Sequence, residues 1–475
     1  MRLVSHVDAL LHCKTQIFPG FEHQYARVYK GAGHYTKAEN LWALALQRQR
    51  ELLGDDHHDT LKAMTSLAEV YINLVQYEKA KTLLVHVLDK QQQILGDDHP
   101  DTFGSMGYLA LTYMMLGQFE NALKLGIQTL DNCKQNLGED HPDTLTSMYT
   151  LGLLYSNLGR FEEAMKLQIP VTAKRRQSLG DNHPYTLTAM NSLSVTYHRL
   201  GKFEEAKVLL MSVVEKQMHR LGQDHPKTLV SMGNLAIQYR SLGEFAKAQE
   251  LELLVFQKRC QVLGHDHPVT LISMTNMAVT YNYLGQSEEA LKLHISVLEK
   301  ERQILGDRHV QTISSMSYLG DTYNYLGQFE EALKLNILAV DKRQHILGEK
   351  HPDTLKSMAN LAITYGALGE FEVAKGIQVC VLEKQRKIAG EDDPNTLRTM
   401  VHLGAMHYQL GNIEEANKLA LSAPQKKLIG DHHPDTQLVI SSLAAAYRMA
   451  GIKVEEAEKP AKLFLKSSTS FKLDE

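Results

Sequence analysis

Apolar residues recur at steps of three and four over long stretches of the chain, with polar residues between them. One such stretch places them at Leu61, Met64, Leu67, Tyr71 and Leu74. Because these steps follow the turn of an α-helix, the apolar side chains share one face and predict an amphipathic helix. A His-Pro-Asp-Thr sequence opens several equivalent stretches. Proline suits the first helical turn there, and aspartate complements the positive end of the helix dipole.

A second apolar run begins at Tyr77 and again steps by three and four, through Ala80, Leu84 and Val87, to Ile94. It predicts a second helix directly after the first. No segment shows the sustained alternation of apolar and polar residues that marks a half-buried strand. The fold class predicted from these patterns is therefore all-α.

Two sets of glycines divide the chain at regular intervals. Glycine commonly ends helices because it adopts positive φ without strain, so two glycines per unit predict two helices per unit. The second set falls inside each unit, and Val75 stands where one of its members is missing. The first set closes the units at a spacing of 42 residues and comprises Gly54, Gly96, Gly138, Gly180, Gly222, Gly264, Gly306, Gly348 and Gly390.

Counting these units predicts about eleven antiparallel helix pairs. A single pair cannot bury its apolar face, whereas stacked neighbours share one continuous core, so the pairs are expected to form an α-solenoid. Function is then to be sought on a surface of the array. The predicted units are 18–54, 55–96, 97–138, 139–180, 181–222, 223–264, 265–306, 307–348, 349–390, 391–430 and 431–466, with a lead-in at 1–17 and a frayed tail at 467–475.

One unit reads Met-x-x-Leu-Ala-x-x-Tyr-x-x-Leu-Gly-x-Phe-Glu-x-Ala over residues 358–374, and residues 148–164 follow it closely. This pattern resembles the tetratricopeptide repeat. The 42-residue period and the Leu-Gly-x-x-His-Pro-x-Thr linkers are similar to the long-helix repeats of kinesin light chains. They also resemble the C-terminal sensor arrays of fungal and bacterial NB-ARC and NACHT signalling ATPases. The resemblance implies a right-handed superhelical solenoid that works as a protein-interaction scaffold without enzymatic activity.

The resemblance leaves three roles open. The chain is expected to be a free scaffold, a sensor array that lacks its NB-ARC or NACHT module, or a cargo adaptor that acts with a motor heavy chain. Only about 17 residues precede the first predicted unit, which is too short for the heptad segment of a kinesin light chain. No phosphate-binding Gly-x-x-x-x-Gly-Lys-Ser/Thr sequence occurs, so nucleotide hydrolysis is not predicted.

Composition narrows the partners. The 475 residues carry 51 Lys+Arg against 55 Asp+Glu, a net charge of −4. This balance gives no electrostatic reason to expect nucleic acid or an anionic membrane as the partner, and no apolar run is long enough for a membrane span. The four cysteines show no disulfide or zinc spacing, and no secretory signal is evident, so a cytoplasmic setting is expected.

Histidines and paired glutamates recur in the repeats and could be taken for metal ligands or catalytic carboxylates. Nine of the 23 histidines occupy one position in the repeat, including His99, His141 and His433, but equivalent linkers are spread along an array and do not converge on one ion. We therefore predict that these histidines open helices, as does Asp393 in the same position. Pairs such as Glu162 and Glu163 open second helices in the same way. No cofactor, metal site or catalytic residue is predicted.

Proline 170 falls inside a predicted second helix. Proline lacks an amide hydrogen and crowds the preceding turn, so we expect a kink or break there.

Partner binding is expected where the repeats diverge. In relatives, the first helices of the units line the concave face. The Asn-Tyr pairs at 282–283 and 324–325 suggest carboxamides that clamp an extended peptide backbone beside flat aromatic surfaces, and the arginines suggest receptors for carboxylates. The predicted ligand is an extended, mildly acidic peptide. The predicted binding residues are Asn157, Asn191, His198, Arg199, Arg240, Asn282, Tyr283, Asp321, Asn324 and Tyr325.

Overall fold

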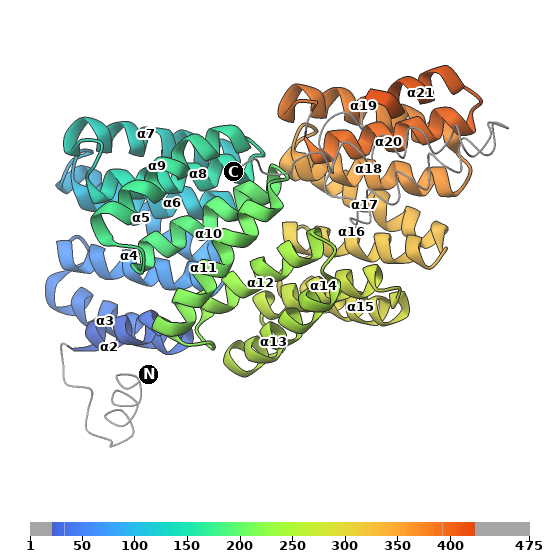
Figure 1. Ribbon diagram of the computed structural model, residues 1–475. Coiled ribbons are helices and arrows are strands. Elements are labelled where there is room, and N and C mark those ends of the chain that lie inside the picture. Colours follow the sequence, from blue (N-terminus) through green and yellow to red (C-terminus); the bar gives the residue numbers. More distant parts are fainter. Residues whose placement is uncertain (1–20, 33, 392, 423–475) are drawn as a thin grey trace, which may run out of the picture. The chain divides into compact units, whose positions relative to one another are not determined.

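The computed structural model describes residues 21–32, 34–391 and 393–422. Throughout these residues the only regular secondary structure is α-helix, arranged as ten consecutive pairs that Figure 1 shows along the chain. The first helices are α2 (Glu22–Gly31), α4 (His58–Asn73), α6 (Pro100–Met115), α8 (Pro142–Asn157), α10 (Pro184–Arg199), α12 (Pro226–Ser241), α14 (Pro268–Tyr283), α16 (Val310–Tyr325), α18 (Pro352–Ala367) and α20 (Pro394–Gln409). The second helices are α3 (Tyr35–Leu53), α5 (Tyr77–Ile94), α7 (Phe119–Leu137), α9 (Phe161–Leu179), α11 (Phe203–Leu221), α13 (Phe245–Leu263), α15 (Ser287–Ile304), α17 (Phe329–Leu347), α19 (Phe371–Ala389) and α21 (Ile413–Ser422).

The all-α solenoid predicted from the sequence is confirmed. The second helices α3, α5, α7, α15, α17 and α19 each pack against the first helix of their own pair and against the first helix of the next pair, as α7 does with α6 and α8. The predicted lead-in, the last predicted unit at 431–466 and the tail lie outside the described residues, as do Cys13 and His433.

The described residues fall into two compact blocks, and each is treated by itself below. The first block comprises the residues up to Leu158 together with Glu162–Leu193 and Glu215–Thr228. The second block comprises Gly159–Phe161, Ser194–Val214 and the residues from Leu229 onward.

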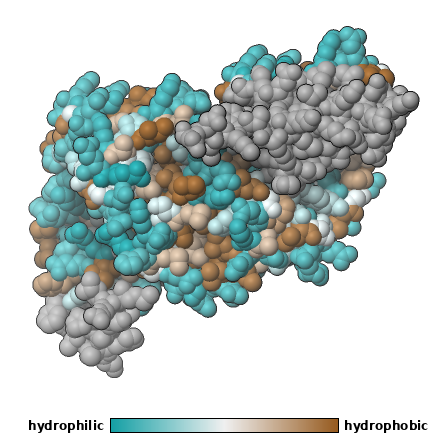
Figure 2. Space-filling view, viewed as in Figure 1, coloured by the Kyte–Doolittle hydropathy of each residue, from teal (hydrophilic) through white to brown (hydrophobic). Residues whose placement is uncertain are grey.

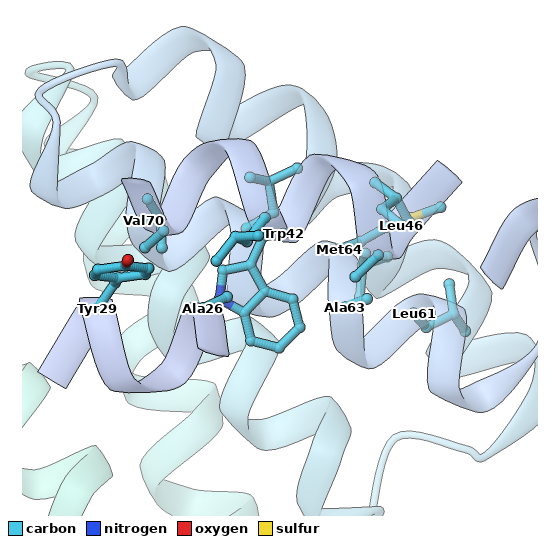
Figure 3. Close-up of a cluster of buried hydrophobic side chains, with 13 residues drawn as sticks. Ala26, Tyr29, Trp42, Leu46, Leu61, Ala63, Met64 and Val70 are labelled. Atoms are coloured by element: carbon cyan, nitrogen blue, oxygen red, sulfur yellow. The ribbon is translucent and has the colours of Figure 1, made fainter. Parts of the chain in front are cut away.

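The core is continuous between neighbouring pairs. In the first block, Tyr29 of α2, Trp42 of α3 and Met64 of α4 are buried in one cluster with aliphatic neighbours (Figure 3). Met64, Met106 and Met190 illustrate the methionine position of the repeat, and each is at most 1% exposed. This burial confirms that the recurrent methionines are core residues, since an unbranched thioether fills the irregular space between packed helices.

The linkers repeat one hydrogen-bonding scheme. At the start of α6, the Nδ1 atom of His99 accepts the backbone N–H of Asp101 at 3.2 Å, and the buried Thr102 hydroxyl donates to the Gly96 carbonyl at 2.9 Å. Gly96 has φ of +90°, which only glycine adopts readily. Asp393 accepts the N–H groups of Asn395 and Thr396 with its carboxylate. The capping prediction is confirmed, and the same histidine bond recurs at His57, His141, His183, His225, His267, His309 and His351.

The break that was one of the two outcomes predicted at Pro170 does not occur. Helix α9 runs from Phe161 to Leu179 without a break, with Pro170 inside it. The carbonyl that loses its donor belongs to Lys166, an exposed residue, so water can replace the missing hydrogen bond.

Buried arginines connect successive pairs. Arg259 of α13 donates to the Leu229 carbonyl of α12 at 3.3 Å and to the Val269 carbonyl of α14 at 3.1 Å. Arg175 and Arg343 make equivalent bonds from α9 and α17. Each guanidinium thus ties its own second helix to the first helices on either side.

Candidate partner-binding surface

The ten predicted binding residues divide between the two blocks. Asn157 and Asn191 belong to the first block, where Asn157 is exposed and donates to the Leu153 carbonyl at 2.9 Å. The other eight belong to the second block, on α10, α12, α14 and α16. The candidate surface is therefore described for the second block alone.

Several of these residues contribute to a recurring contact between successive pairs, here called the junction triad. It contains a residue near the end of one first helix, a residue on the second helix of the same pair, and a residue on the next first helix. Three successive triads of the second block are polar: Arg240, Glu252 and Thr280; Asn282, His294 and Thr322; Asn324, Asn336 and Thr364.

The position of Asn282 corrects one prediction. Its side chain is only 7% exposed, and its amide donates to the Thr322 hydroxyl at 2.8 Å. The His294 ring nitrogen lies 2.9 Å from the same hydroxyl. Asn282 is therefore not placed to clamp a peptide backbone, because its donor serves the contact with the next helix pair.

Asn324 repeats this arrangement in a half-buried position. Its amide donates to the Thr364 hydroxyl at 2.9 Å, and Asn336 donates to the same oxygen at 2.9 Å. Asn282 and Asn324 therefore recur 42 residues apart because each makes the same contact with the next helix pair.

Arg240 is likewise engaged within the protein. Its guanidinium contacts the Glu252 carboxylate at 2.7 Å, the Asn276 carbonyl at 3.1 Å and the Thr280 hydroxyl at 3.2 Å. Burial raises the pKa of Glu252 to about 7, although the charge of Arg240 acts in the opposite direction. The prediction that Arg240 receives an acidic ligand is corrected, because its guanidinium group already pairs with the Glu252 carboxylate.

The two predicted tyrosines differ in their surroundings. Tyr283 stacks on Phe245 with ring centroids 5.3 Å apart and an angle of 14° between the planes. At the equivalent of Phe245 the next pair has Ser287, and Tyr325 is 56% exposed. Tyr325 therefore presents most of its ring to solvent, whereas Tyr283 is part of the packing.

Cations from three helices act on one place in the second block. The ammonium of Lys356 on α18 lies 5.5 Å from the centre of the Tyr318 ring on α16. Lys356 lowers the pKa of the Tyr318 hydroxyl; burial opposes this effect, while Arg240 of α12 and Arg199 of α10 add to it. We call the surface that carries Arg199, Tyr318 and Lys356 the cationic surface. The exposed Tyr325 ends the same helix as Tyr318, about two helical turns further along.

Carboxylates lie beside the cationic surface. Arg199 is 4.0 Å from Asp353, and its charge, with that of Arg343, outweighs burial and lowers the pKa of Asp353. Asp321 accepts a hydrogen bond from Asn360 at 2.8 Å. Burial raises the pKa of Asp321 to about 6, against the attraction of Lys356 and Arg398. The surface is thus positive but partly neutralised.

His198 lies next to Arg199 but is tied to its neighbours. Its Nδ1 atom is 3.0 Å from the Gln238 side-chain oxygen, and its ring meets Phe203 edge-on with centroids 5.1 Å apart. Burial and the nearby Arg199 lower the pKa of His198 to about 4, so the ring is neutral at physiological pH.

Within the described ranges, no group of three or more histidine, cysteine, aspartate or glutamate side chains is arranged to hold a metal ion. No helix in this part of the chain is long and apolar enough to span a bilayer. The face drawn in Figure 2 carries apolar residues among a majority of polar ones.

Sequence comparison decides the family. Tetratricopeptide repeat profiles match residues 21–81, 101–169, 270–340 and 311–383, and a second set of profiles matches 186–227, 228–269 and 396–435. The chain belongs to the tetratricopeptide repeat family. Its fold is that of a scaffold typical of protein–protein interaction, and members of the family typically bind protein partners and are not enzymes.

Two solved structures illustrate what these tetratricopeptide repeats are similar to. A structure from Podosopora anserina, described as kinesin light chain nearly identical TPR-like repeats, is 31% identical, covers 44% of this chain and 98% of its own, and gives a TM-score of 0.37. A Rap protein complexed with competence and sporulation factor is 11% identical, covers 77% of this chain and 99% of its own, and gives a TM-score of 0.57. The second likeness shows the fold alone. A search of curated protein sequences finds no significant match.

The sequence analysis missed Lys356 and Tyr318 as parts of the surface. A signal for Lys356 was present, because it stands at the repeat position of Lys62, and Arg398 follows it at the next unit. Tyr318 carried no comparable signal, since its position in the repeat holds residues as different as Ser66 and Asn276.

Proposed function

We propose that this protein is a cytoplasmic, non-enzymatic scaffold that binds an extended, mildly acidic peptide segment of a partner protein on the cationic surface of the second block. The observation that carries the proposal is the Lys356 ammonium 5.5 Å from the centre of the Tyr318 ring, together with the charge of Arg199, which also lowers the pKa of the Tyr318 hydroxyl. Arginine and lysine recognise carboxylates, and an exposed tyrosine provides apolar contact at a small loss of side-chain entropy.

The proposed contacts are fewer than the sequence suggested. Arg199, Lys356 and Tyr325 would meet the ligand, because all three are exposed or half-buried. Asp321 and Asp353 moderate the positive charge, so a ligand with a few acidic residues fits better than a polyanion. The helices that carry the surface would be held in place by hydrogen bonds of Asn282, Arg240 and His198, which would not contact the ligand.

The test uses the full chain and a display library of random twelve-residue peptides. We expect the protein to enrich acidic sequences that also contain an apolar residue. Replacing Tyr325 or Lys356 by alanine should weaken binding of the enriched peptides about tenfold each, which corresponds to about 1.4 kcal/mol. Enrichment without acidic bias would contradict the proposal, and so would variants that bind the enriched peptides as tightly as the unchanged protein does.

A matched control separates local from general charge effects. Lys334 on α17 is exposed and pairs with Glu331 at 2.8 Å on its own helix. Lys334→Ala changes the net charge as Lys356→Ala does, and it should leave peptide binding unchanged.

The identity to kinesin light chain-like repeats favours one partner for a direct test, a motor heavy chain. Co-purification of the full chain with a heavy-chain segment, abolished by Arg199→Glu, would support that role. An NB-ARC or NACHT module is the other partner to examine in the same assay.

A further inference from the structure

One position on the second helices is aliphatic and exposed in every pair from α5 to α19. The residues are Val85, Ile127, Ile169, Met211, Leu253, Ile295, Ile337 and Val379, spaced by 42, and each is between 36% and 48% exposed. Single exposed apolar residues are ordinary, but one at the same place in eight successive helices forms a row. We call the part of this row in the second block the aliphatic stripe: Met211, Leu253, Ile295, Ile337 and Val379.

The stripe is separate from the cationic surface. It lies on α11, α13, α15, α17 and α19, which are second helices, whereas the cationic surface is carried by first helices. The residues directly before the stripe residues, such as His294 and Asn336, are buried in the junction triads. The stripe residues are therefore turned away from the packing within the array.

Spacing limits the kind of partner. Successive second helices pack against the same intervening first helix, so they follow one another at about one helix diameter, roughly 10 Å. A partner α-helix rises about 10 Å in seven residues and returns to the same face, as in a heptad. An extended strand covers the same distance in about three residues, which would turn alternate side chains away.

Charge beside the stripe limits the partner further. Glu299, Asp341 and Glu383 follow Ile295, Ile337 and Val379 by one helical turn and are exposed. Among the described residues, Glu299 and Glu383 take part in no ion pair, and Asp341 lies 3.6 Å from the His345 ring. On the opposite side, Lys292 and Lys334 are already paired with Glu289 and Glu331 on their own helices. Three exposed acidic side chains, Glu299, Asp341 and Glu383, therefore border the stripe on one side.

One groove between second helices is present in the first block. In the first block, a cavity of about 640 Å³ lies between α3 and α5, with Ala43, Gln47 and Thr82 on its walls and Leu67 and Tyr71 of α4 among its lining residues. Ala43 stands at the repeat position of the stripe residues. A side chain from a partner helix can enter a groove of this kind beside an aliphatic contact.

We propose that the aliphatic stripe is a second docking surface, and that it takes an amphipathic α-helix with an apolar residue about every seven positions and basic residues along one flank. The partner helix would cross α13, α15, α17 and α19 in turn, with its basic flank along Glu299, Asp341 and Glu383. The protein would then hold two partners at once, a peptide on first helices and a helix on second helices.

The test uses a labelled 28-residue alanine-based helical peptide with one leucine per heptad and lysines on one flank. Fluorescence anisotropy with the full chain should show saturable binding that weakens as salt rises, because exposed charge pairs are screened. A peptide of the same composition with leucines every six residues spreads them around the helix and should bind at least tenfold more weakly. Equal binding of the two peptides would overturn the proposal.

Variants locate the binding. Changing Ile295, Ile337 and Val379 together to glutamine should weaken binding at least tenfold, while Val373→Gln, an exposed change on α19 outside the stripe, should not. Unchanged binding by the triple variant would overturn the proposal. Sedimentation of the unliganded chain tests a second copy as occupant: a dimer that the triple variant dissociates would also overturn it.

The outcome is independent of the proposed peptide site. Arg199→Glu with Lys356→Glu should abolish peptide capture and leave helix binding intact. The stripe variant should do the reverse.

Discussion

The junctions of the two blocks solve the same packing problem with different chemistry. In the first block, Met114, Gly126 and Leu154 occupy the triad, and a Cβ atom on Gly126 would lie 2.6 Å from a Leu154 methyl carbon. In the second block, Asn282, His294 and Thr322 hold the equivalent positions with hydrogen bonds. The apolar triad depends on fit alone, whereas the polar triad also depends on donors meeting acceptors.

This difference bears on function. Apolar contact has no preferred direction, so the first-block junction is held by the shapes of its side chains and not by oriented bonds. A buried hydrogen bond is lost when its donor moves, and the unsatisfied group then costs free energy. The polar triads therefore fix the relative position of α14, α16 and α18 more tightly, and α16 and α18 carry Tyr318 and Lys356 of the cationic surface.

The largest expected effect breaks the apolar triad. Leu154→Ala removes a fully buried side chain beside Gly126 and leaves a cavity, and it should lower the free energy of local unfolding by about 4 kcal/mol. Hydrogen exchange of the α6 and α8 amides measures this loss. Ile127→Ala, an exposed change on α7, is the control and should cost under about 1 kcal/mol. A small loss at Leu154 would mean that fit is not what holds this junction.

The polar triad should respond to pH where the apolar one does not. Burial lowers the pKa of His294 to about 4 from its usual 6.5, so the folded state favours the neutral ring. The unfolded chain binds the proton below pH 6.5 and the folded chain only near pH 4. The contribution of the neutral His294 ring to the free energy of unfolding is therefore fully present above pH 6.5. It falls by about 3 kcal/mol as the pH drops to 4.

His294→Asn tests this pH dependence. Asparagine occupies the same position at Asn336 and can donate to Thr322, so the variant should keep the junction and lose most of this acid sensitivity. Hydrogen exchange of α14 to α16 at pH 7.5 and pH 5 provides the comparison, and His86→Asn, an exposed change on α5, should alter neither value. An unchanged acid response in His294→Asn would show that another group is responsible.

The shared hydroxyl of the polar triad should contribute less. Thr322→Val keeps the side-chain shape and removes the oxygen that lies within hydrogen-bonding distance of Asn282 and His294, for an expected cost of about 2 kcal/mol. Thr322→Ser retains the oxygen and should recover part of this loss. Hydrogen exchange of the α16 amides measures both stabilities. Equal values for the valine and serine variants would show that the hydroxyl does not stabilise the junction.

The smallest expected effect concerns the α4–α5 turn of the first block, where Val75 replaces the glycine found at Gly117 and in the second block. Val75 has φ of +63°, whereas Gly243, Gly285 and Gly327 of the second block stand at the same position with φ between +74° and +77°. A β-branched residue is strained there, so Val75→Gly should stabilise the α4–α5 turn by about 1 kcal/mol. Gly285→Val is the reverse change and should destabilise its turn. Thermal unfolding measures both changes. A lower melting temperature for Val75→Gly, or a higher one for Gly285→Val, would contradict the prediction.

Much of the fold was predictable from the sequence because it depends on periodic features. The step of apolar residues gave the helices, the two glycine sets gave the pairs, and the His-Pro-x-Thr linkers gave the caps. Burial of Met64 and Met106 followed from their phase relative to the apolar face. These properties are local, so one chain contains enough information to infer them.

The binding residues were harder to predict, because their role depends on which neighbour a side chain meets. Asn282 and Tyr283 are adjacent in sequence, yet one faces the next first helix and the other stacks on Phe245. A second polar column, Thr280, Thr322 and Thr364, follows the asparagines at the same period and was a usable sign of the junction. The partial exposure of Tyr325 rests on a single change, serine for phenylalanine at residue 287, whose effect requires the packing to be known.

The junction triads also limit which 42-residue repeats the protein can gain or lose during evolution. Gain or loss of one 42-residue unit preserves every linker cap, because each unit begins and ends in the same way. In the second block, loss of one central unit would set Asn282 against Thr364 instead of Thr322, and the amide would still meet a threonine hydroxyl. In the first block the next-helix position differs from unit to unit, so the same event would set Ile72 against Leu154 instead of Thr112 and exchange a polar neighbour for an apolar one. Recombination is therefore expected to lengthen or shorten the array more readily in its second block, next to the residues proposed to bind partners.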